Sequence, residues 1–532
     1  MGRSRRFCEA SEVMSGFRAW RFACVGVVLV LSSFCDVGLG RVAGLRAAEL
    51  AARLTARNRL TSDELHRHAA VLADDTFEGR EAGKRGGRAA AGYLVDKLKS
   101  YGLNGAGSDG GYLQPFDRER QNVLAQLPGT DPELRKEVIV IGAHYDHVGY
   151  GNQRNSYGPY GYIHNGADDN ASGVAAVLET ARVLTELKVE LKRTVVFAFW
   201  DGEEAGLYGS KHWLSRPTAN LPDVRCFINL DMIGRLRDDV VEVFGSRTAH
   251  GLRKLLTEAN RSERLVLDYK WELRDDSDHA PFFHAGIPVV MLHTGKHNDY
   301  HRPSDDVEKL NVDGILRISR LAMETVFQLA DAPTVPKFRA LSKQEAVSEA
   351  GRKGMDRPYA APPGRLGLSW RDGDDGSAGI LVSNVQYGSP AAKAGLRIGE
   401  RITHFDGTKI DGDELFQKLV SRAAPNITLK VVDRAGAERD AAVELRGEPV
   451  IVGVSWAEDD AEPQMVVVKR IVPGSPAATA GVQVADRIYE VDGTPLADAE
   501  DFDRRLETME DKISFTVDRA GITLHFDLRL DQ

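Results

Sequence analysis

Cysteine is scarce in this sequence, with four residues among 532. Three of them, Cys8, Cys24 and Cys35, precede residue 41, so a chain processed at that point would keep only Cys226. A single thiol leaves no intramolecular disulfide, even in a compartment that permits disulfides. The fold must therefore be stabilised by the packing of its core.

Long basic runs and long apolar runs are missing as well. With a formal net charge of −9 and no extended Lys/Arg stretch, the chain lacks the positive surface that nucleic-acid binding requires. The apolar run Phe22–Leu31 is too short to span a bilayer comfortably. We therefore exclude nucleic acid as a partner and expect no membrane span beyond the N-terminal segment.

The first 40 residues have the layout of a signal peptide. Several arginines precede Phe22–Leu31, and Gly38-Leu39-Gly40 supplies the small residues that a signal peptidase requires. We predict that residues 1–40 direct export, so that the protein is secreted or periplasmic. The alternatives are an uncleaved segment that anchors the protein to a membrane, and a buried apolar helix.

A chain of this length exceeds a single hydrophobic core, so several domains are expected. Within residues 50–332, apolar stretches of strand length alternate with helical periods. This alternation predicts an α/β fold in which a mostly parallel, mixed sheet is flanked by helices. The expected strands are 137–143, 194–200, 226–230, 240–244 and 287–292, and the expected helices are 88–101, 172–187, 251–260 and 314–329.

The C-terminal part of the chain repeats itself, behind a polar stretch at residues 333–364 that we interpret as a linker. Gly388-Ser389-Pro390 recurs 86 positions later as Gly474-Ser475-Pro476, and other short segments recur at the same offset. A constant offset indicates two copies of one domain. We predict these copies at residues 365–447 and 449–532.

Five segments of the α/β region carry residues that bind metals. The first expected strands run directly into acidic or histidine residues, and open α/β sheets bind ligands at such carboxyl ends. Cysteine takes no part, and His, Asp and Glu form a ligand set suited to zinc. Five ligands fit two zinc ions that share one bridging carboxylate. The segments begin at Gly142 (GAHYDHVG), Asn165 (NGADDNASG), Trp200 (WDGEEAGLYGS), Asn229 (NLDMIG) and Asp299 (DYHRPSD).

Together, these segments resemble the di-zinc exopeptidase family that includes secreted bacterial aminopeptidases. The resemblance covers roughly residues 60–332 and implies the zinc-exopeptidase (phosphorylase/hydrolase-like) fold with two zinc ions per chain. The family places its bridging carboxylate three residues before a Ser-Gly pair, which selects Asp169 over its neighbour Asp168. The implied terminal ligands are His144 and Asp231 for one ion, and Glu204 and His301 for the other.

The resemblance also implies roles for residues beside the ligands. Glu203 is the expected general base, because a carboxylate that binds no metal can still accept the proton of the attacking water. Asp146 is expected to accept the remaining ring N–H of His144, since residues two apart on a strand point the same way. A cis peptide bond is implied between Asp169 and Asn170.

Other residues near these segments have plainer interpretations. A Glu-Glu pair by itself is usually a solvated surface, and Asp168-Asp169-Asn170 by itself is usually a turn or a helix cap. Five segments in the family's order favour the metal site instead. Ser277-Asp278-His279 either lines the substrate side of the site or caps the following helix. Four histidines match no ligand position and are expected to line the pocket or the surface: His147, His164, His293 and His297.

Each C-terminal copy resembles a PDZ domain, a small mainly-β peptide-binding module. The loops at Leu366-Gly367-Leu368 and Val452-Gly453-Val454 would present backbone N–H groups to the C-terminal carboxylate of a peptide ligand, which adds to the sheet as a strand. Alternatively, a copy is only a spacer, or packs on the metallopeptidase domain with its groove filled.

These features predict an exported zinc aminopeptidase that acts on peptides. The alternatives are a carboxypeptidase, a dipeptidase, a hydrolase of another amide, and a PDZ scaffold with an inactive peptidase domain. The retention of Glu203 and all five ligands argues against inactivity. Arg235 and Arg237 follow Asp231 closely enough to bind a substrate carboxylate, which would favour a carboxypeptidase.

Overall fold

The structure is a computed structural model that describes residues 51, 53–345, 347, 354–355, 357–361, 364–372, 378–509 and 511–530. The expected export segment, residues 1–40, lies outside the described residues. The chain divides into two units, Met1–Arg59 and Leu60–Gln532, and the described residues of the first unit are helical. Among the residues described, no helix combines the length and apolarity needed to cross a membrane.

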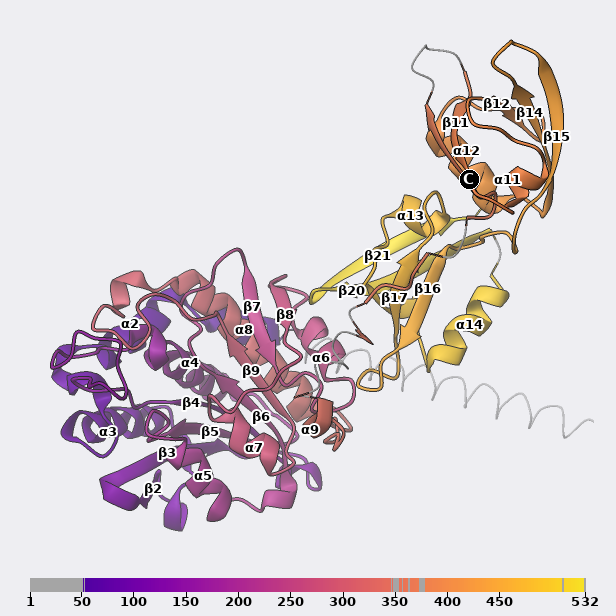
Figure 1. The fold of residues 1–532 in the computed structure, drawn as a ribbon. Coiled ribbons are helices and arrows are strands. Elements are labelled where there is room, and N and C mark those ends of the chain that lie inside the picture. Colours follow the sequence, from indigo (N-terminus) through magenta and orange to yellow (C-terminus); the bar gives the residue numbers. More distant parts are fainter. Residues whose placement is uncertain are drawn as a thin grey trace, which may run out of the picture. The chain divides into compact units, whose positions relative to one another are not determined.

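A nine-stranded mixed sheet forms the centre of the α/β region (Figure 1). The strand order is β1-β3-β5-β4-β6-β9-β7-β8, with β2 beside β3. The central strands β5, β4, β6 and β9 run parallel, whereas β3 and β7 join them antiparallel. The strands are β1 (Asn104–Gly105), β2 (Leu113–Phe116), β3 (Arg120–Leu127), β4 (Val138–His144), β5 (Thr194–Trp200), β6 (Val224–Leu230), β7 (Val240–Phe244), β8 (Val266–Tyr269) and β9 (Val289–His293).

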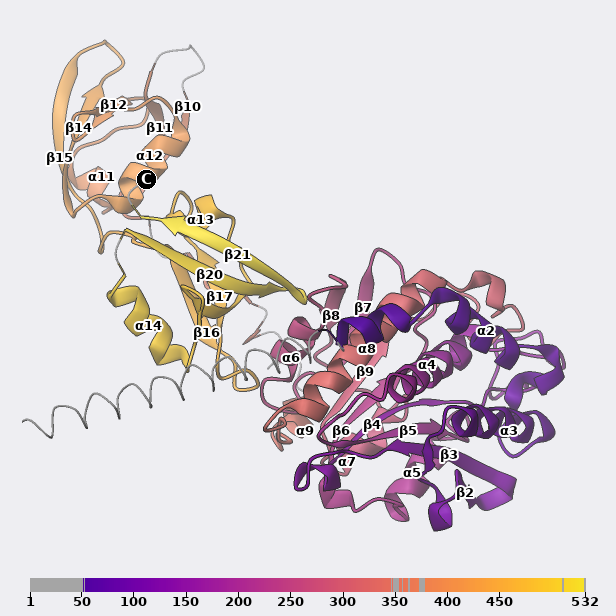
Figure 2. The same cartoon turned by 180° about the vertical axis from the view of Figure 1, so that it is seen from behind.

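Helices cover both faces of this sheet, as Figure 2 shows from behind. Helices α4 and α8 pack against β4 on one face, and α7 packs against β6 and β9 on the other. The prediction of a mixed sheet flanked by helices is confirmed. The helices are α2 (Ser62–Leu72), α3 (Arg85–Ser100), α4 (Gly173–Glu186), α5 (Tyr208–Ser215), α6 (Leu252–Ala259), α7 (His279–His284), α8 (Val312–Asp331) and α9 (Ser342–Glu345).

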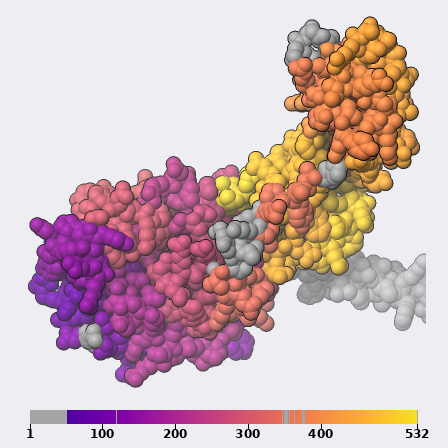
Figure 3. Space-filling view, viewed as in Figure 1, coloured from indigo at the N-terminus to yellow at the C-terminus, as the bar shows by residue number. Residues whose placement is uncertain are grey.

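The central strands are apolar along their whole length because both of their faces are buried. Every side chain of β4 is buried, and alternate residues such as Val138 and Val140 pack in a cluster with Trp213 of α5 and Phe282 of α7. Trp213 and Phe282 stack with ring centroids 5.5 Å apart. A strand covered on both sides has no polar face, so its polar residues begin only where it leaves the sheet. In the space-filling view this region, coloured indigo to rose, is one closely packed body (Figure 3).

The sequence repeat corresponds to two six-stranded sheets with the same strand order, β10-β11-β12-β14-β15 and β16-β17-β18-β20-β21, with β13 beside β12 in the first and β19 beside β18 in the second. Ser389 and Ser475 occupy equivalent N-cap positions, each followed by proline at the first helical turn. The first copy comprises β10 (Leu368–Asp372), β11 (Ile380–Val385), α11 (Pro390–Lys393), β12 (Arg401–Phe405), β13 (Thr408–Lys409), α12 (Asp413–Arg422), β14 (Asn426–Val432) and β15 (Glu438–Glu444). The second comprises β16 (Val454–Glu458), β17 (Val466–Ile471), α13 (Pro476–Ala480), β18 (Arg487–Val491), β19 (Thr494–Pro495), α14 (Ala499–Glu507), β20 (Lys512–Arg519) and β21 (Ile522–Arg529).

Candidate metal centre

The residues with metal-binding side chains meet at the carboxyl edge of the parallel strands. His144 is the last residue of β4, Glu204 follows β5, and Asp231 follows β6 directly. Asp169 lies in the π-helical turn Ala167–Ser172 that leads into α4, and His301 lies in the loop after β9. The sheet therefore brings together five residues that are far apart in the sequence.

Two ligand groups share Asp169. His144 Nε2 lies 3.3 Å from Asp169 Oδ1 and 3.4 Å from Asp231 Oδ1, and these three residues form the first candidate metal position. His301 Nε2 lies 3.1 Å from Asp169 Oδ2 and 3.1 Å from Glu204 Oε2. These three residues and His147 form the second candidate group, within which Asp169, Glu204 and His301 are the expected ligands of the second metal position. Asp169 thus presents a different carboxylate oxygen to each position.

The spacing and chemistry of these atoms fit zinc. Two atoms that bind one tetrahedral zinc ion at about 2.0–2.2 Å lie about 3.3–3.6 Å apart, close to the separations observed here. His301 Nε2 is buried and has no hydrogen-bond partner among the described residues, although it faces two carboxylates. A ring nitrogen buried in this way is well placed to ligate a cation.

The charges in the cluster also favour cations. Burial lowers the pKa of His301, but Glu204 and Asp169 raise it, for a net value of about 11. Burial likewise lowers the pKa of His144, which Glu203 and Asp231 raise well above the ordinary value. Converging carboxylates thus dominate the field at both imidazoles, and a divalent cation would relieve their mutual repulsion.

The adjacent residues Glu203 and Glu204 differ in their proton affinity. Burial raises the pKa of Glu203 well above the ordinary range, and His144 opposes this only partly. Burial and Asp169 also raise the pKa of Glu204, but His301 and His147 lower it to about 2. Two carboxylates whose environments shift their pKa values in opposite directions suit different tasks, proton transfer for the first and ligation for the second.

Asp146 contacts a different partner from the one expected. His144 Nδ1 lies 3.1 Å from the backbone carbonyl oxygen of Asp146 and 3.8 Å from its carboxylate. The carboxylate instead accepts the backbone N–H of Glu203 at 3.0 Å. The expectation of a carboxylate–histidine hydrogen bond was wrong because β4 ends at His144, so the two-residue alternation of a strand does not extend to Asp146.

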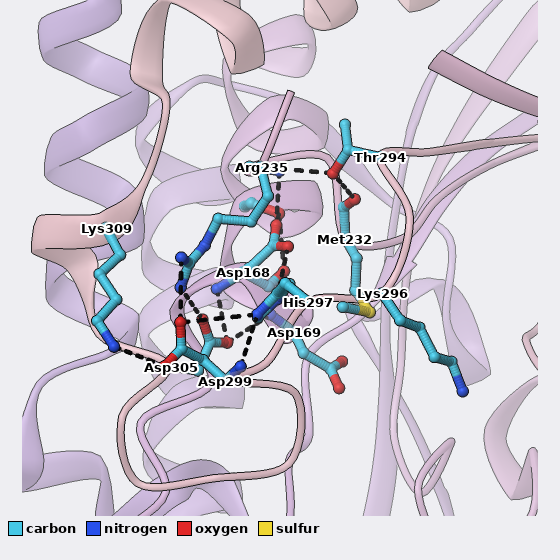
Figure 4. Close-up of polar contacts among 12 residues, drawn as sticks. Asp168, Asp169, Met232, Arg235, Thr294, Lys296, His297, Asp299, Asp305 and Lys309 are labelled. Carbon is cyan, nitrogen blue, oxygen red and sulfur yellow. Dashed lines mark hydrogen bonds and ion pairs between the residues drawn. The ribbon is translucent and has the colours of Figure 1, made fainter. Parts of the chain in front are cut away.

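A network of buried charges holds the segment that carries Asp169 (Figure 4). Asp305 Oδ2 accepts the backbone N–H groups of Asp168 and Asp169 at 2.9 and 3.1 Å. Arg235 donates to Asp305 Oδ1 at 2.7 Å, and His297 Nε2 lies 3.1 Å from Asp168 Oδ2. The expected cis peptide bond between Asp169 and Asn170 is present.

A cavity of about 310 Å³ opens onto the ligand groups. Its walls combine carboxylates, including Glu203, with apolar and aromatic side chains, and Ser277 lies at its edge. Ser277 Oγ donates to Asp231 Oδ2 at 2.5 Å, and no side-chain hydrogen bond caps α7. Of the two interpretations of the Ser277 segment, the geometry therefore favours the lining of the site. The apolar and aromatic wall residues are Met232, Phe244, Met291 and Tyr300.

Comparison with known families agrees with this geometry. The description "Peptidase family M28" matches residues 122–326, and PDZ domain descriptions match residues 364–445 and 467–519. The chain carries an M28 peptidase domain and two PDZ domains.

Individual proteins resemble the M28 domain at moderate identity. Leupeptin-inactivating enzyme 1 of Streptomyces exfoliatus is 30% identical over 45% of this chain and 49% of its own length. Leucine aminopeptidase 1 of Grosmannia clavigera is 28% identical over 56% of this chain and 73% of its own length. The match thus spans about half the length of the first relative. Among solved structures, the LapA aminopeptidase of Legionella pneumophila has a TM-score of 0.44 and 22% identity, over 53% of this chain and 74% of that chain.

The two arginines after Asp231 are committed to other contacts in the M28 domain. Arg235 binds Asp299 and Asp305, and Arg237 donates to the backbone carbonyls of Thr294 and Lys296. Neither arginine lines the cavity, although Arg274 and Lys296 do. Arg235 and Arg237 therefore act as structural residues of the loops around the site.

The sequence did not reveal the roles of several buried polar residues of the M28 domain. Arg80 is fully buried and donates to the carbonyls of Tyr145, Asn165 and Gly166, which fixes the loops behind the ligands. His147, expected as a pocket or surface residue, is buried beside Glu204. No motif marks these contacts, because their partners are distant in sequence. Three other histidines matched no ligand of the family. His293 lines the cavity, His164 is hydrogen-bonded to Ser156, and His297 faces Asp168.

Proposed function

We propose that the protein is a zinc-dependent aminopeptidase that removes N-terminal residues from peptides outside the cytoplasm. The single observation that carries this proposal is the arrangement of Asp169, whose two oxygens face two separate ligand groups at the floor of a cavity. Glu203 lines the same cavity but belongs to neither ligand group. That combination matches the needs of hydrolysis assisted by two metal ions.

Each residue of the site has a defined task in this proposal. His144, Asp169 and Asp231 would hold one zinc ion, and Asp169, Glu204 and His301 the other. The bound ions would acidify the attacking water and polarise the scissile carbonyl. Glu203 accepts the proton of that water and delivers it to the leaving amine nitrogen. Asp146 keeps Glu203 in position through the hydrogen bond to its backbone N–H.

The charge distribution supports cleavage at the N-terminus of the peptide. A free α-amine is a cation at neutral pH, and the carboxylates of Glu203 and Asp231 line the cavity. Arg235 and Arg237, which could have received a substrate carboxylate, are engaged elsewhere. The apolar wall formed by Met232, Phe244 and Met291 favours an apolar first side chain.

A carboxypeptidase is the second candidate, because Arg274 and Lys296 line the cavity and carry positive charge. Paired substrates separate the two functions. The purified full-length protein, loaded with zinc, is given a peptide with a leucine N-terminus, its N-acetylated form and its C-amidated form. An aminopeptidase cleaves the free and the amidated peptide and spares the acetylated one. Cleavage of the acetylated peptide alongside resistance of the amidated peptide would identify a carboxypeptidase.

The remaining parts of the chain support an exported enzyme with peptide-capture modules. The composition of residues 1–40 supports secretion or a periplasmic location, with anchoring by an uncleaved segment as the alternative. The PDZ copies, at 365–447 and 449–532, would bind the C-termini of peptides or partner proteins. In each copy a tryptophan of the first strand, Trp370 or Trp456, packs edge-on against a helix phenylalanine. Binding of a labelled peptide with a free C-terminus, compared with its amide, tests this role.

A further inference from the structure

His147 is a buried histidine of the M28 domain that the proposed mechanism does not use. Its side chain has no solvent exposure, and its Nδ1 lies 2.8 Å from Glu204 Oε1. The ring is packed tightly, since a Cβ atom on Gly166 would lie 2.5 Å from its Cδ2. It also meets His301 edge-on, with ring centroids 5.5 Å apart. His147 thus contacts Glu204 and His301 of the second metal position, and its Nδ1 lies 3.8 Å from the third residue, at Asp169 Oδ2.

The distances distinguish His147 from the ligands. The four contacts between atoms that face one metal position measure 3.1–3.4 Å, as expected for neighbouring ligands of one ion. The contact of 2.8 Å between His147 and Glu204 is a hydrogen-bond distance instead, and Asp169 Oδ2 is 3.8 Å away from the same nitrogen. The two carboxylate oxygens of Glu204 therefore face different partners. Oε1 contacts His147, and Oε2 faces the second metal position.

The environment of the ring agrees with a hydrogen-bond donor. No described residue lies within hydrogen-bonding reach of the buried Nε2 of His147. If Nδ1 carries the proton, Nε2 is left with an unpaired acceptor. If Nδ1 bound a metal, Nε2 would carry an N–H group that is buried without a partner, which is the rarer situation in proteins.

We infer that His147 is a positioning residue, which donates its Nδ1–H to Glu204 Oε1 and thereby commits Oε2 to the second metal position. This inference rests on the metal centre of the proposed function. Hydrogen bonds to metal-binding carboxylates hold them in one orientation, and their loss typically lowers metal affinity about 10–100-fold. Because His147 touches no residue of the first metal position other than the shared Asp169, its loss should affect the second position alone.

The test is a metal titration of the chelated full-length protein with zinc in the presence of a competing chelator. Wild-type protein should bind two ions. His147→Ala should weaken one of them about 10–100-fold and leave the other unchanged. His147→Asn should restore affinity to within about threefold of wild type, because its amide places an N–H group near the original Nδ1. His164→Ala is the control, since His164 is equally buried and hydrogen-bonded to a side chain, Ser156, yet belongs to neither group of candidate ligands.

A spectroscopic readout separates positioning from ligation. In protein labelled with ¹⁵N-histidine and loaded with ¹¹³Cd, two imidazole rings should show coupling to cadmium, those of His144 and His301. Coupling to a third ring, together with failure of His147→Asn to restore affinity, would make His147 a ligand and overturn the inference. Unchanged affinity in His147→Ala would overturn it as well. A wild-type protein that binds fewer than two ions would refute the metal centre itself, and the inference with it.

Discussion

Arg235 offers a sharp test of the charge network behind Asp169. Its guanidinium is largely buried and pairs with Asp305, whose side chain has no solvent exposure. In Arg235→Gln the carboxylate of Asp305 loses its cation but keeps two backbone N–H donors. Removal of one partner from a buried ion pair costs about 3–5 kcal/mol, and the remaining donors favour the lower end, about 3 kcal/mol. The matched control is Arg237→Gln, because Arg237 is exposed and donates to carbonyl groups alone.

Calorimetry of the chelated protein measures this cost directly. For a domain of this size, about 3 kcal/mol corresponds to a melting temperature about 6–12 °C lower. The transition to be compared is that of the M28 domain, which is recognised because zinc shifts it to a higher temperature. Arg237→Gln should shift the same transition by about 2 °C or less, as expected for a surface substitution. Equal shifts in the two variants would refute the view that Arg235 neutralises a buried charge.

The pH dependence adds a second check on the same variant. Burial raises the pKa of Asp305, and Arg235 opposes that rise, so the substitution should raise this pKa further. A carboxyl group with a raised folded-state pKa destabilises the fold above that pKa, and the penalty disappears as the pH falls toward the unfolded value of about 3.9. The difference between Arg235→Gln and Arg237→Gln should therefore shrink as the pH is lowered from 7 to 5. A constant difference would contradict the assigned cause.

Further predictions concern the metal centre and the direction of cleavage. Glu203→Gln should lose about 10²–10⁴-fold in kcat while it still binds two zinc ions, whereas Glu204→Gln should lose metal; equal metal content and equal rates in the two variants would show that the assigned division of labour is incorrect. Crystals soaked with zinc should show two anomalous peaks about 3.5–4 Å apart on either side of Asp169, and a single peak would rule out a two-metal centre. Chelation should abolish peptide hydrolysis and zinc should restore it, and activity that survives complete chelation would exclude a metal-dependent mechanism. N-acetylation of a good substrate should reduce its cleavage at least about 100-fold if the α-amine binds among carboxylates, as competition kinetics would measure.

The fold of the M28 domain was predictable because its sheet is buried on both faces. Strands β5 and β7 coincide with the expected ranges 194–200 and 240–244. All residues of β5 are buried, and β7 is apolar except for Glu242, so both runs indicate strands of a sheet that helices cover. The ends of β6 and β9 differed by one or two residues, because hydrogen bonding to neighbouring strands, which sequence periodicity does not report, decides where a strand stops. The repeat alone indicated two copies of one domain, and the resemblance of each copy to a PDZ domain supplied its type.

The gathering of metal-binding residue types at one edge could also be predicted from the sequence, since a parallel sheet brings the carboxyl ends of its strands together, and the family resemblance assigned the individual ligands. The contacts between neighbouring residues of the site could not be predicted from the sequence. Asp146 turned its carbonyl rather than its carboxylate to His144 because the strand ends there, and the roles of His147 and Arg235 depend on partners 57 and 70 residues away. The sequence alone determined five adjacent strands of the nine-stranded sheet and which residue types gather at its edge, because burial and periodicity are local properties. Only the tertiary structure decided which oxygen of Glu204 faces the metal position and which arginine neutralises Asp305, because such contacts arise where loops from different strands pack together.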